Sequence, residues 1–355
     1  MSSPLHVGIL TGGGDCPGLN AVIRAVTKSL LNQCHARVTG IEGGFAGLMS
    51  ATPQTRPLCW DNVCGILMQG GTILGTSNTA NPLAQAADTE RVLQHARTLG
   101  LDALVVIGGD GSMHIANGLA QRGLQIVGVP KTIDNDIVGC EQSFGFDTAV
   151  HTATEALEKL QTTGQSHSRV MILETMGRYA GWIALHAGLA GAADVIVLPE
   201  LDYDVQHIAD VCRAREQRQR YTLICIGEGA KPQGGQLTVE RRLAHSPDPI
   251  RLGGVGHALR EQLQPLLRSE VRATVLGHVQ RGGSPTPYDR VLATQFGHEA
   301  AQLVIQQRFG HMVTLQNGRL GHIALQDVAQ QQRRVPLNHP LLQLARQIGV
   351  SLGSA

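Results

Sequence analysis

The chain has 355 residues, which suits about two domains of ordinary size rather than one small core. Of these residues 42% are hydrophobic and 16% are charged, a composition that is typical of a globular protein. A net charge of +1 and an aromatic share of 3% argue against nucleic-acid binding, since they leave neither a basic field nor a base-stacking platform.

The predicted elements follow one pattern along the chain, in which a short apolar strand ends in glycines and a helix follows. The first strand, "HVGIL", leads through "TGGGDCPG" into a helix. One apolar stripe of this helix is formed by Leu19, Val22, Ile23, Val26 and Leu30. Later strands are predicted at "ALVVIGG", "IVGV", "VMILET", "LICIGEG" and "ATVLGHV".

These strands show little alternation of apolar and polar residues and are separated by helices. Such a pattern predicts an α/β fold whose mainly parallel sheet is covered on both faces. Ligands of these sheets bind beyond the carboxyl ends of the strands, where each polar, glycine-rich cluster of this chain falls. The segment 231–255 is polar and rich in glycine and proline, and we expect a long loop or an insertion there.

Two clusters have the form of strand, glycine turn and helix. In the first, "LTGGGDCPGLN", Gly12, Gly13 and Gly14 let backbone amides approach a phosphate, and the N-terminus of the following helix favours negative charge. The spacing is neither that of a P-loop nor that of a dinucleotide-binding fingerprint. The alternative is a tight turn that only packs the helix against the strand.

The second cluster, "VVIGGDGSM", adds a carboxylate to the same design. Gly109, Gly111 and Ser112 are predicted to line phosphates. Asp110 falls at the end of the strand, where its oxygens suit Mg²⁺, a cation that prefers carboxylate and phosphate oxygens. The alternative is an aspartate that caps the next helix.

A third cluster, "GVPKTIDNDIVG", places two carboxylates and an ammonium after an apolar run. One of Asp134 and Asp136 can act as a general base, and the other can lie near the metal. A general base contributes roughly 10²–10⁴-fold to a rate. Lys131 would neutralise phosphoryl charge. The alternative is an asparagine- and aspartate-rich turn without a chemical role.

Basic residues near two further strand ends predict a second phosphorylated ligand, distinct from the donor. Arg178 lies in "ETMGRYAG", and Arg272, His278 and Arg281 lie in "VRATVLGHVQRGGSP". Arginine suits two-pronged recognition of phosphate. Each arginine taken alone is better explained by a surface ion pair, whereas the set favours a phosphate.

Four motifs, "GGDGS", "PKTIDNDI", "MGRYAGW" and "RATVLGHVQRGGSPTPYDR", resemble those of the bacterial-type 6-phosphofructokinase family, from about residue 7 to about residue 298. The start "LTGGGDCPGLNAVIRAV" and the longer segment from "GEGAKP" to "LGGVG" resemble a subgroup with ATP-dependent and pyrophosphate-dependent members. The resemblance implies transfer of the γ-phosphoryl group of ATP to the 1-hydroxyl of fructose 6-phosphate in glycolysis. It also implies Mg²⁺ as cofactor.

By this resemblance Asp134 is the catalytic base, and Thr132 and Asp136 flank it at the substrate and the metal. The donor would be held by Gly14, Gly109, Asp110, Gly111 and Ser112, with Asp110 as the metal ligand. The sugar phosphate would be bound by Thr132, Asp134, Asp136, Met176, Gly177, Arg178, Glu228, His278 and Arg281.

The resemblance also implies an assembly of identical subunits. Arg169 and Arg272 match arginines that reach across from a neighbouring subunit, so we expect a homo-oligomer, usually a tetramer and otherwise a dimer. Each subunit would have two Rossmann-like three-layer domains with mainly parallel sheets and the active site in the cleft between them. The donor domain would comprise residues 1–145 and about 280–330, and the sugar-phosphate domain residues 146–279 and about 331–355.

The cellular location is predicted from features that the sequence lacks. The N-terminus has no charged region followed by a long apolar core, and no apolar run approaches the ~18 residues of a membrane span. The seven cysteines form no CxxC pair and fit reduced thiols. We therefore expect a cytoplasmic protein without a membrane segment and without a nucleic-acid partner.

Two positions bear on the phosphoryl donor, and they disagree. Gly111 is expected of ATP-dependent members, in which a bare backbone leaves room for the α-phosphate, while pyrophosphate-dependent members carry aspartate there. Lys131 is expected of pyrophosphate-dependent members. Steric exclusion at residue 111 is the stronger effect, so the sequence favours ATP, and a pyrophosphate-dependent phosphotransferase is the alternative.

Control by effectors is expected to be weak or absent. Arg24 and Lys28 match a basic helix face that binds effector phosphates in regulated relatives. The alternative is that this helix face is only exposed to solvent. Asp194 matches an acidic residue of the same relatives. Gln69 and Gln161 stand where those relatives have arginine. The loss of two cations should weaken the binding of ADP or phosphoenolpyruvate.

Two other functions compete with this one. NAD kinases and lipid kinases share a GGDG turn, but the TIDND and MGRYAG motifs argue against them. A sugar-phosphate sensor without catalysis is disfavoured, because the base, metal and arginine positions are all filled.

Overall fold

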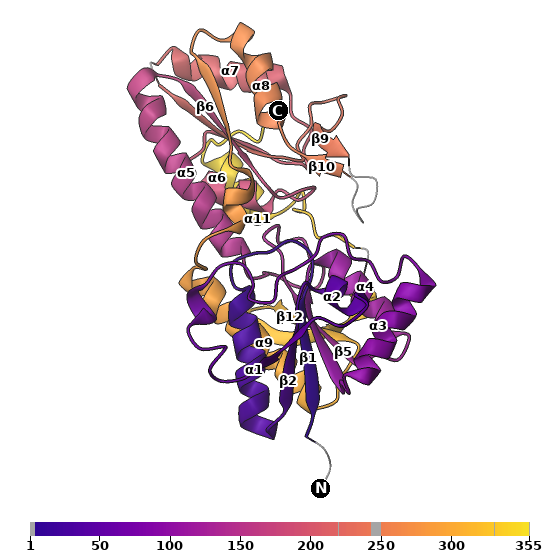
Figure 1. Cartoon of the computed structure of the whole chain (residues 1–355). Helices are drawn as coiled ribbons and strands as arrows, with labels where there is room; N and C mark the ends of the chain where they lie inside the picture. Colours follow the sequence, from indigo (N-terminus) through magenta and orange to yellow (C-terminus); the bar gives the residue numbers. More distant parts are fainter. Residues whose placement is uncertain (1–3, 219, 243–249, 330, 355) are drawn as a thin grey trace.

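The computed structural model describes residues 4–218, 220–242, 250–329 and 331–354. Figure 1 shows two lobes, each built around a central sheet with helices on both sides. The fold is mixed α/β with mainly parallel sheets, as the sequence predicts. Within the described ranges, the chain has no helix with the length and apolar character of a membrane span.

The larger sheet consists, within the described residues, of seven strands: β1 (His6–Thr11), β2 (Arg37–Ile41), β3 (Thr55–Leu58), β4 (Ala103–Gly108), β5 (Ile126–Pro130), β12 (His311–Gln316) and β13 (Arg319–Ala324). Their order across the sheet is β13-β12-β5-β4-β1-β2-β3. The inner strands are parallel, and the edge strands β3 and β13 are antiparallel to their neighbours. The carboxyl ends of β1, β4 and β5 therefore meet at one edge of the sheet.

Helices cover both faces of this sheet. On one face lie α1 (Leu19–Cys34) and α9 (Pro287–Ile305), and on the other lie α2 (Phe45–Met49), α3 (Ala86–Thr98), α4 (Asp110–Ala120) and α10 (Leu325–Val328). In β4, Ile107 belongs to the core under the first set of helices, and its neighbour Val106 belongs to the core under the second. Burial on both sides explains why the strand lacks apolar–polar alternation.

The stripe predicted for the first helix is confirmed. The fully buried residues of α1 include Leu19, Val22, Ile23, Val26 and Leu30. They pack in the core shared with α9 and the sheet. Full burial of such a side chain contributes about 1.5–3 kcal/mol, so the stripe fixes α1 and the glycine turn that precedes it.

The smaller sheet has, in the part of the chain that is described, four parallel strands: β6 (Val170–Thr175), β7 (Val195–Val197), β8 (Thr222–Gly227) and β11 (Val271–Val275). Their order is β11-β6-β8-β7. Helices α5 (Phe146–His167) and α6 (Trp182–Ala190) pack on one face, and α7 (Val205–Glu216) and α8 (Val255–Leu263) pack on the other. Helix α11 (Pro340–Gln347) packs beside α6.

Of the two possibilities predicted for residues 231–255, a long loop or an insertion, the structure shows an insertion that carries a pair of strands. Strands β9 (Val239–Arg242) and β10 (Ile250–Leu252) form an antiparallel pair, and residues 243–249 lie outside the described residues. The carboxylate of Glu174 fixes the segment after β10 by accepting the N–H groups of Gly254 (2.9 Å) and Gly256 (2.7 Å). Among the described residues the 3₁₀ helices are η1 (Ile66–Met68), η2 (Gln264–Leu266) and η3 (Gly277–Arg281).

Candidate active site

A cavity of about 630 Å³ lies between the two lobes, at the carboxyl ends of strands from both sheets. The larger lobe contributes the segments after β1, β4 and β5, and the segments after β6 and β8 face them together with η3. The predicted site residues that line the cavity are Gly14, Gly109, Asp110, Gly111, Ser112, Lys131, Thr132, Asp134, Asp136, Met176, Arg178, Glu228, His278 and Arg281. The cavity thus brings the three clusters of the larger lobe together with the basic residues.

Side chains are disfavoured in the first glycine turn, by the backbone at Gly13 and by close neighbours at Gly12 and Gly14. Gly13 has a left-handed φ of 77°. A Cβ on Gly12 would lie 2.6 Å from Ser112 Oγ, and one on Gly14 would lie 2.8 Å from Arg281 Nη1. Glycine therefore allows both glycine turns and η3 to meet, which is a closer approach than the packing of one helix on one strand requires.

The second glycine turn leads from β4 into α4, and Gly109 is the capping residue of this helix. Asp110 is the first helical residue and not the cap, so the alternative of a capping aspartate is wrong. Its side chain lies at the cavity instead. A Cβ on Gly111 would meet no atom of the described residues within 4 Å, so the space beside this glycine is open.

The aspartate loop, residues 131–137, follows β5 and turns beside the cavity. Asn135, between the two aspartates, has a left-handed φ of 54°. Its side chain accepts the N–H of Ser143 (3.1 Å) and donates to the carbonyl of Glu141 (3.2 Å). These bonds hold a backbone conformation that a residue with a Cβ rarely adopts. The aspartates on either side of Asn135 both line the cavity.

Asp134 is buried, with 4% of its surface exposed, and its N–H donates to Thr132 Oγ1 (3.0 Å). Its Oδ1 atom is buried and has no hydrogen-bond partner among the described residues. Leaving a buried polar group unpaired costs about 1–3 kcal/mol, so such a group needs an explanation, for example a catalytic role or a bound ion. A turn without a chemical role does not explain it.

Asp110, Asp134 and Asp136 are three of the carboxylates that line the cavity. Burial raises the pKa of Asp136, the charges of Asp134 and Asp110 raise it further, and Arg178 opposes the rise. The set fits Mg²⁺, which is held by one or two carboxylates together with waters and phosphate oxygens. No group of three or more His, Cys, Asp or Glu in the described ranges is arranged to hold a metal alone, so a phosphate ligand would have to complete the coordination.

Glu228 holds the bend that presents Arg178 to the cavity. Its carboxylate accepts the N–H groups of Gly177 (3.3 Å) and Arg178 (2.9 Å), and both residues have positive φ, 141° and 50°. Burial raises the pKa of Glu228 to about 7, although the bond from Arg178 opposes the rise. Gly177 supports this bend and is not itself part of the cavity lining.

Arg169 and Arg272 do not line the cavity of this chain. They lie at the amino ends of β6 and β11, opposite to the strand ends that face the cleft. Both pair with Glu270, with 2.6 Å between Arg169 Nε and Glu270 Oε2. Within one chain these two arginines are therefore separated from the other predicted sugar-phosphate residues.

Further cavity-lining residues were not predicted from the sequence. They are Asp15, Phe45, Ser77, Asn78, Ala80, Asn81, His114, Ile115, Glu240, Arg241, Ile250 and Leu252. The segment "GTSNTANP", residues 75–82, carries a signal in its turn-forming composition, and the Ser77 carbonyl accepts the N–H of Gly13 (3.1 Å). The strands β9 and β10 carry no such signal, because their polar sequence has no clear period.

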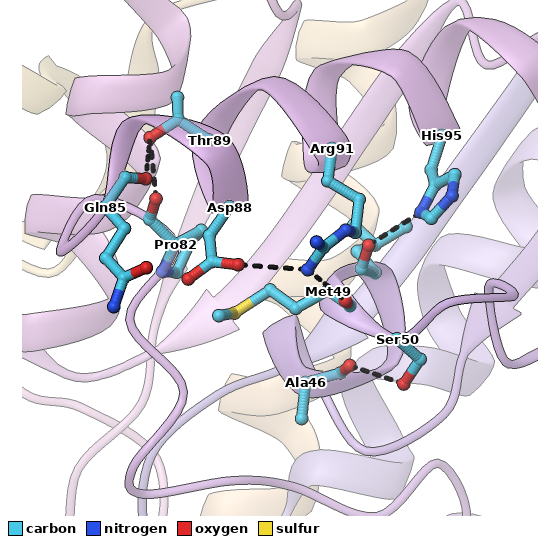
Figure 2. Close-up of polar contacts among 10 residues, drawn as sticks. Ala46, Met49, Ser50, Pro82, Gln85, Asp88, Thr89, Arg91 and His95 are labelled. Atoms are coloured by element: carbon cyan, nitrogen blue, oxygen red, sulfur yellow. Dashed lines mark hydrogen bonds and ion pairs between the residues drawn. The ribbon is translucent and has the colours of Figure 1, made fainter.

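Figure 2 shows the contacts of α3 with α2 and with Pro82, the last residue of the wall formed by residues 75–82. Thr89 Oγ1 donates to the carbonyl of Pro82 (2.6 Å). Arg91 Nη1 joins the two helices by donating to the carbonyl of Met49 (3.2 Å). The Thr89 bond fixes the end of the segment that contributes Ser77, Asn78, Ala80 and Asn81 to the cavity.

Two positions expected to bear on effector control have partners within the chain. Gln161 Nε2 donates to the hydroxyl of Tyr221 (2.8 Å). Asp194 pairs with Arg215 (2.8 Å) and accepts the N–H of Leu223 (2.9 Å). Gln161 is thus engaged with a neutral group, and the charge of Asp194 already has a cation partner.

The chain matches the protein-family model described as Phosphofructokinase over residues 6–304. It is 44% identical to ATP-dependent 6-phosphofructokinase 2 of Clostridium perfringens, over 99% of each chain. It is 45% identical to the pyrophosphate–fructose 6-phosphate 1-phosphotransferase of Amycolatopsis methanolica, over 94% of this chain and 96% of that protein.

Among solved structures, the phosphofructokinase of Pichia pastoris in the T-state is similar, with a TM-score of 0.81 and 30% identity. The similarity covers 92% of this chain but 36% of the Pichia chain, so the present chain corresponds to a part of that longer protein. The family match covers most of the chain, and the bacterial relatives match it over nearly their whole length. The chain therefore belongs to the phosphofructokinase family.

Proposed function

We propose that the chain is an ATP-dependent 6-phosphofructokinase, which transfers the γ-phosphoryl group of ATP to the 1-hydroxyl of fructose 6-phosphate. The observation that carries this proposal is the buried Asp134 carboxylate, which lines a cavity between the glycine turns and the basic residues and has an oxygen without a partner among the described residues. The 44% identity to a relative named ATP-dependent 6-phosphofructokinase supports the same reaction. A cytoplasmic role in glycolysis is part of the proposal.

The larger lobe binds the phosphoryl donor. The two glycine turns offer backbone N–H groups to the phosphates, and the start of α4 adds the positive end of a helix dipole. Asp110 would hold Mg²⁺, which would supply positive charge to neutralise the donor phosphates. Lys131, whose Nζ donates to the carbonyl of Gly14, brings a cation to the first turn.

The smaller lobe and η3 bind fructose 6-phosphate. Arg178, His278 and Arg281 hold its phosphate, and Glu228 accepts hydrogen bonds from its hydroxyls. Anchoring the far end of the sugar in this way brings the 1-hydroxyl to the aspartate loop. Asp134 accepts the hydroxyl proton while the oxygen bonds to the γ-phosphorus, the bond to the bridging oxygen breaks, and ADP leaves.

The two proposed domains correspond to the two sheets. Residues 1–145 and about 280–330 form the donor domain, because β1, β4, β5, β12 and α9 belong to the larger sheet and its cover. Residues 146–279 and about 331–355 form the sugar-phosphate domain, which holds the smaller sheet. The site then lies in the cleft where the two domains meet.

We also propose a homo-oligomer, either a tetramer or a dimer. Arg169 and Arg272 serve the site of a neighbouring subunit, and their position at the strand ends away from the cleft supports this arrangement. Control by ADP or phosphoenolpyruvate is weak, because Gln69 and Gln161 offer no cation to an effector phosphate.

ATP is the proposed donor, and pyrophosphate is the second candidate. The open space beside Gly111 favours ATP, because a nucleotide needs room beyond two phosphates. Phe45, Asn78 and Ile115 give part of the cavity the mixed apolar and polar lining that suits a nucleoside. Lys131 and the 45% identity to a relative named as pyrophosphate-dependent favour the second candidate.

Purified protein with Mg²⁺ and fructose 6-phosphate should form fructose 1,6-bisphosphate from ATP. Asp134→Asn should lower kcat by roughly 10²–10⁴-fold without lowering the thermal midpoint, since it removes the base and a buried charge. Asp327→Asn, at an exposed residue of α10, is the matched control and should keep the wild-type rate. If product forms with pyrophosphate and not with ATP, pyrophosphate is the donor. If product forms with neither compound, the proposed reaction is refuted.

A further inference from the structure

A segment after α10 leads from the larger lobe to the smaller one (Figure 1). This segment, residues 331–335, is here called the strap, and it lies beyond the family match, which ends at residue 304. Gln332 forms an isolated antiparallel bridge with Ile137, which places the strap against the aspartate loop. The proposed reaction gives the strap no role.

Arg333, in the strap, binds two successive carbonyls of the aspartate loop. Its N–H donates to the carbonyl of Asp136 (2.7 Å), and its Nη1 donates to the carbonyl of Asn135 (3.0 Å). Asn135 is the residue with the left-handed backbone between the two aspartates. Bonds to both carbonyls fix the orientation of the two peptide planes on either side of Asp136, and the first of these planes begins at Asn135, the residue after Asp134.

The other side of Arg333 is held by the smaller lobe. Its guanidinium carbon lies 4.1 Å from the centroid of the Trp182 ring, and Trp182 Nε1 donates to the Arg333 carbonyl (3.1 Å). Trp182 is buried and is the first residue of α6. It directly follows the "MGRYAG" segment, which presents Arg178 to the cavity.

A carboxylate next to Trp182 strengthens the same connection. Glu200 accepts the N–H of Gly181 (3.0 Å), which precedes α6, and the N–H of Val335 (2.8 Å) in the strap. The strap is therefore attached to the start of α6 at two residues, directly at Arg333 and through Glu200 at Val335.

We propose that Arg333 is a positioning residue that fixes the aspartate loop relative to the bend carrying Arg178. This inference rests on the proposed phosphoryl transfer. In that reaction Asp134 must lie next to the 1-hydroxyl of the sugar, while the other lobe holds the phosphate at the far end of the same sugar. A misplacement of the reacting groups by about 1 Å can lower the rate by 10²-fold. Arg333 contacts the aspartate loop on one side and, on the other, Trp182, which directly follows the bend that carries Arg178.

Arginine suits this place better than lysine does. A planar guanidinium can stack on an aromatic ring and donate to a carbonyl in its own plane at the same time, whereas an ammonium is a point charge on a flexible stem. Arg333→Lys should therefore keep the charge and lose part of the geometry. The exposed neighbour Arg334 provides a matched control.

Steady-state kinetics test the role of Arg333 in catalysis. Arg333→Gln should lower kcat by about 10- to 100-fold, Arg333→Lys should fall between this variant and wild type, and Arg334→Gln should keep the wild-type rate. In an Asp134→Asn background, Arg333→Gln should lower kcat by less than about threefold, because the base that it positions is gone. Equal factors in both backgrounds would mean that Arg333 supports the fold only, and they would overturn the proposal.

Amide hydrogen exchange of the protein without substrates tests the contact independently of activity. Arg333→Gln and Arg333→Lys should speed exchange in residues 131–137 by about tenfold or more, with α1 unchanged, and Arg334→Gln should not. Unchanged exchange in the aspartate loop overturns the positioning role whether or not the protein makes fructose 1,6-bisphosphate. A wild type that is inactive with both donors, but shows the exchange effect, refutes the reaction and not the contact.

Discussion

Replacing Thr148 by valine tests the contact between the starts of α5 and α9, which joins the two lobes. Thr148 donates its N–H (2.8 Å) and its hydroxyl (2.6 Å) to Asp289 Oδ2. The hydroxyl also accepts the N–H of Thr286 (3.0 Å), the capping residue of α9. Thr148 is 4% exposed and Asp289 is 0% exposed. Valine has nearly the shape of threonine, so the substitution removes these hydroxyl bonds and little else.

The variant should lose about 2–4 kcal/mol of unfolding free energy at pH 8. A hydrogen bond to an ionised carboxylate contributes about 1.5–3 kcal/mol, and the half-buried Thr286 N–H adds about 1 kcal/mol when it loses its partner. Asp289 Oδ1 is already without a partner among the described residues, so the carboxylate has few other bonds to compensate for the loss.

The size of this loss depends on pH in a defined direction. Burial raises the pKa of Asp289 to about 6, and the bonds from Thr148 oppose the rise. Because the folded value lies above that of an unfolded aspartate, stability falls as pH rises from about 4 to about 6. Removing the hydroxyl raises the folded pKa further, so the variant loses additional stability above pH 6. At pH 5 the carboxyl is mostly protonated when folded, and the loss should be about 1 kcal/mol.

Urea unfolding at pH 5 and pH 8, at one protein concentration, measures both losses. Thr154→Val is the matched control, because Thr154 Oγ1 donates to the carbonyl of Val150 (2.8 Å) within α5. This control should lose the same small free energy at both pH values. A Thr148→Val loss that is equal at the two pH values, or larger at pH 5, would refute the view that the hydroxyl supports an ionised Asp289.

Two further predictions concern the acceptor side. Glu228→Gln should raise the thermal midpoint at pH 8, because burial raises the pKa of Glu228 to about 7 and the ionised carboxylate is costly in the folded protein above that pH. The same variant should raise the KM for fructose 6-phosphate. An equal gain at pH 5 contradicts this cause. Arg272→Gln should raise the same KM by about tenfold with little change in the KM for ATP. Mixing it with Asp134→Asn subunits should restore activity, and no recovery argues against action across an interface.

The strands and the clusters at their ends were predictable because each is local in the sequence. Short apolar runs without alternation predict strands buried on both faces, and parallel strands bring their carboxyl ends to one edge. This rule alone predicts that Gly14, Asp110 and Asp134 lie near one another, although they follow three different strands. The structure places all three at one cavity.

The strap and the β9–β10 pair were not predictable in the same way. Arg333 and Asn135 are separated by 198 positions in the chain, and the strap has no periodic pattern that indicates its partner. The insertion carrying β9 and β10 is polar, so its pairing depends on contacts made elsewhere, such as those of Glu174 with Gly254 and Gly256. Contacts of this kind depend on the finished fold and leave no local trace.

Gly111 and Lys131 favour different donors only if both act at the same place, and the structure separates them. Lys131 Nζ donates to the carbonyl of Gly14 and lies 3.6 Å from the position of a Cβ on Gly13, at the first glycine turn. Beside Gly111, at the second turn, no atom of the described residues lies within 4 Å of the Cβ position. We therefore infer that the lysine acts on the phosphates that both donors share, and that residue 111 controls the room for a nucleotide.

Parallel assays with ATP and pyrophosphate test this separation. Gly111→Asp should fold, because its Cβ has space, and should raise the KM for ATP about tenfold more than the KM for pyrophosphate, since a carboxylate would repel and crowd the nucleotide phosphates. Lys131→Met should lower kcat by similar factors with both donors, because it removes a cation from a phosphoryl group that both supply. If the Lys131→Met loss were confined to pyrophosphate, the lysine rather than the open space beside Gly111 would decide the donor.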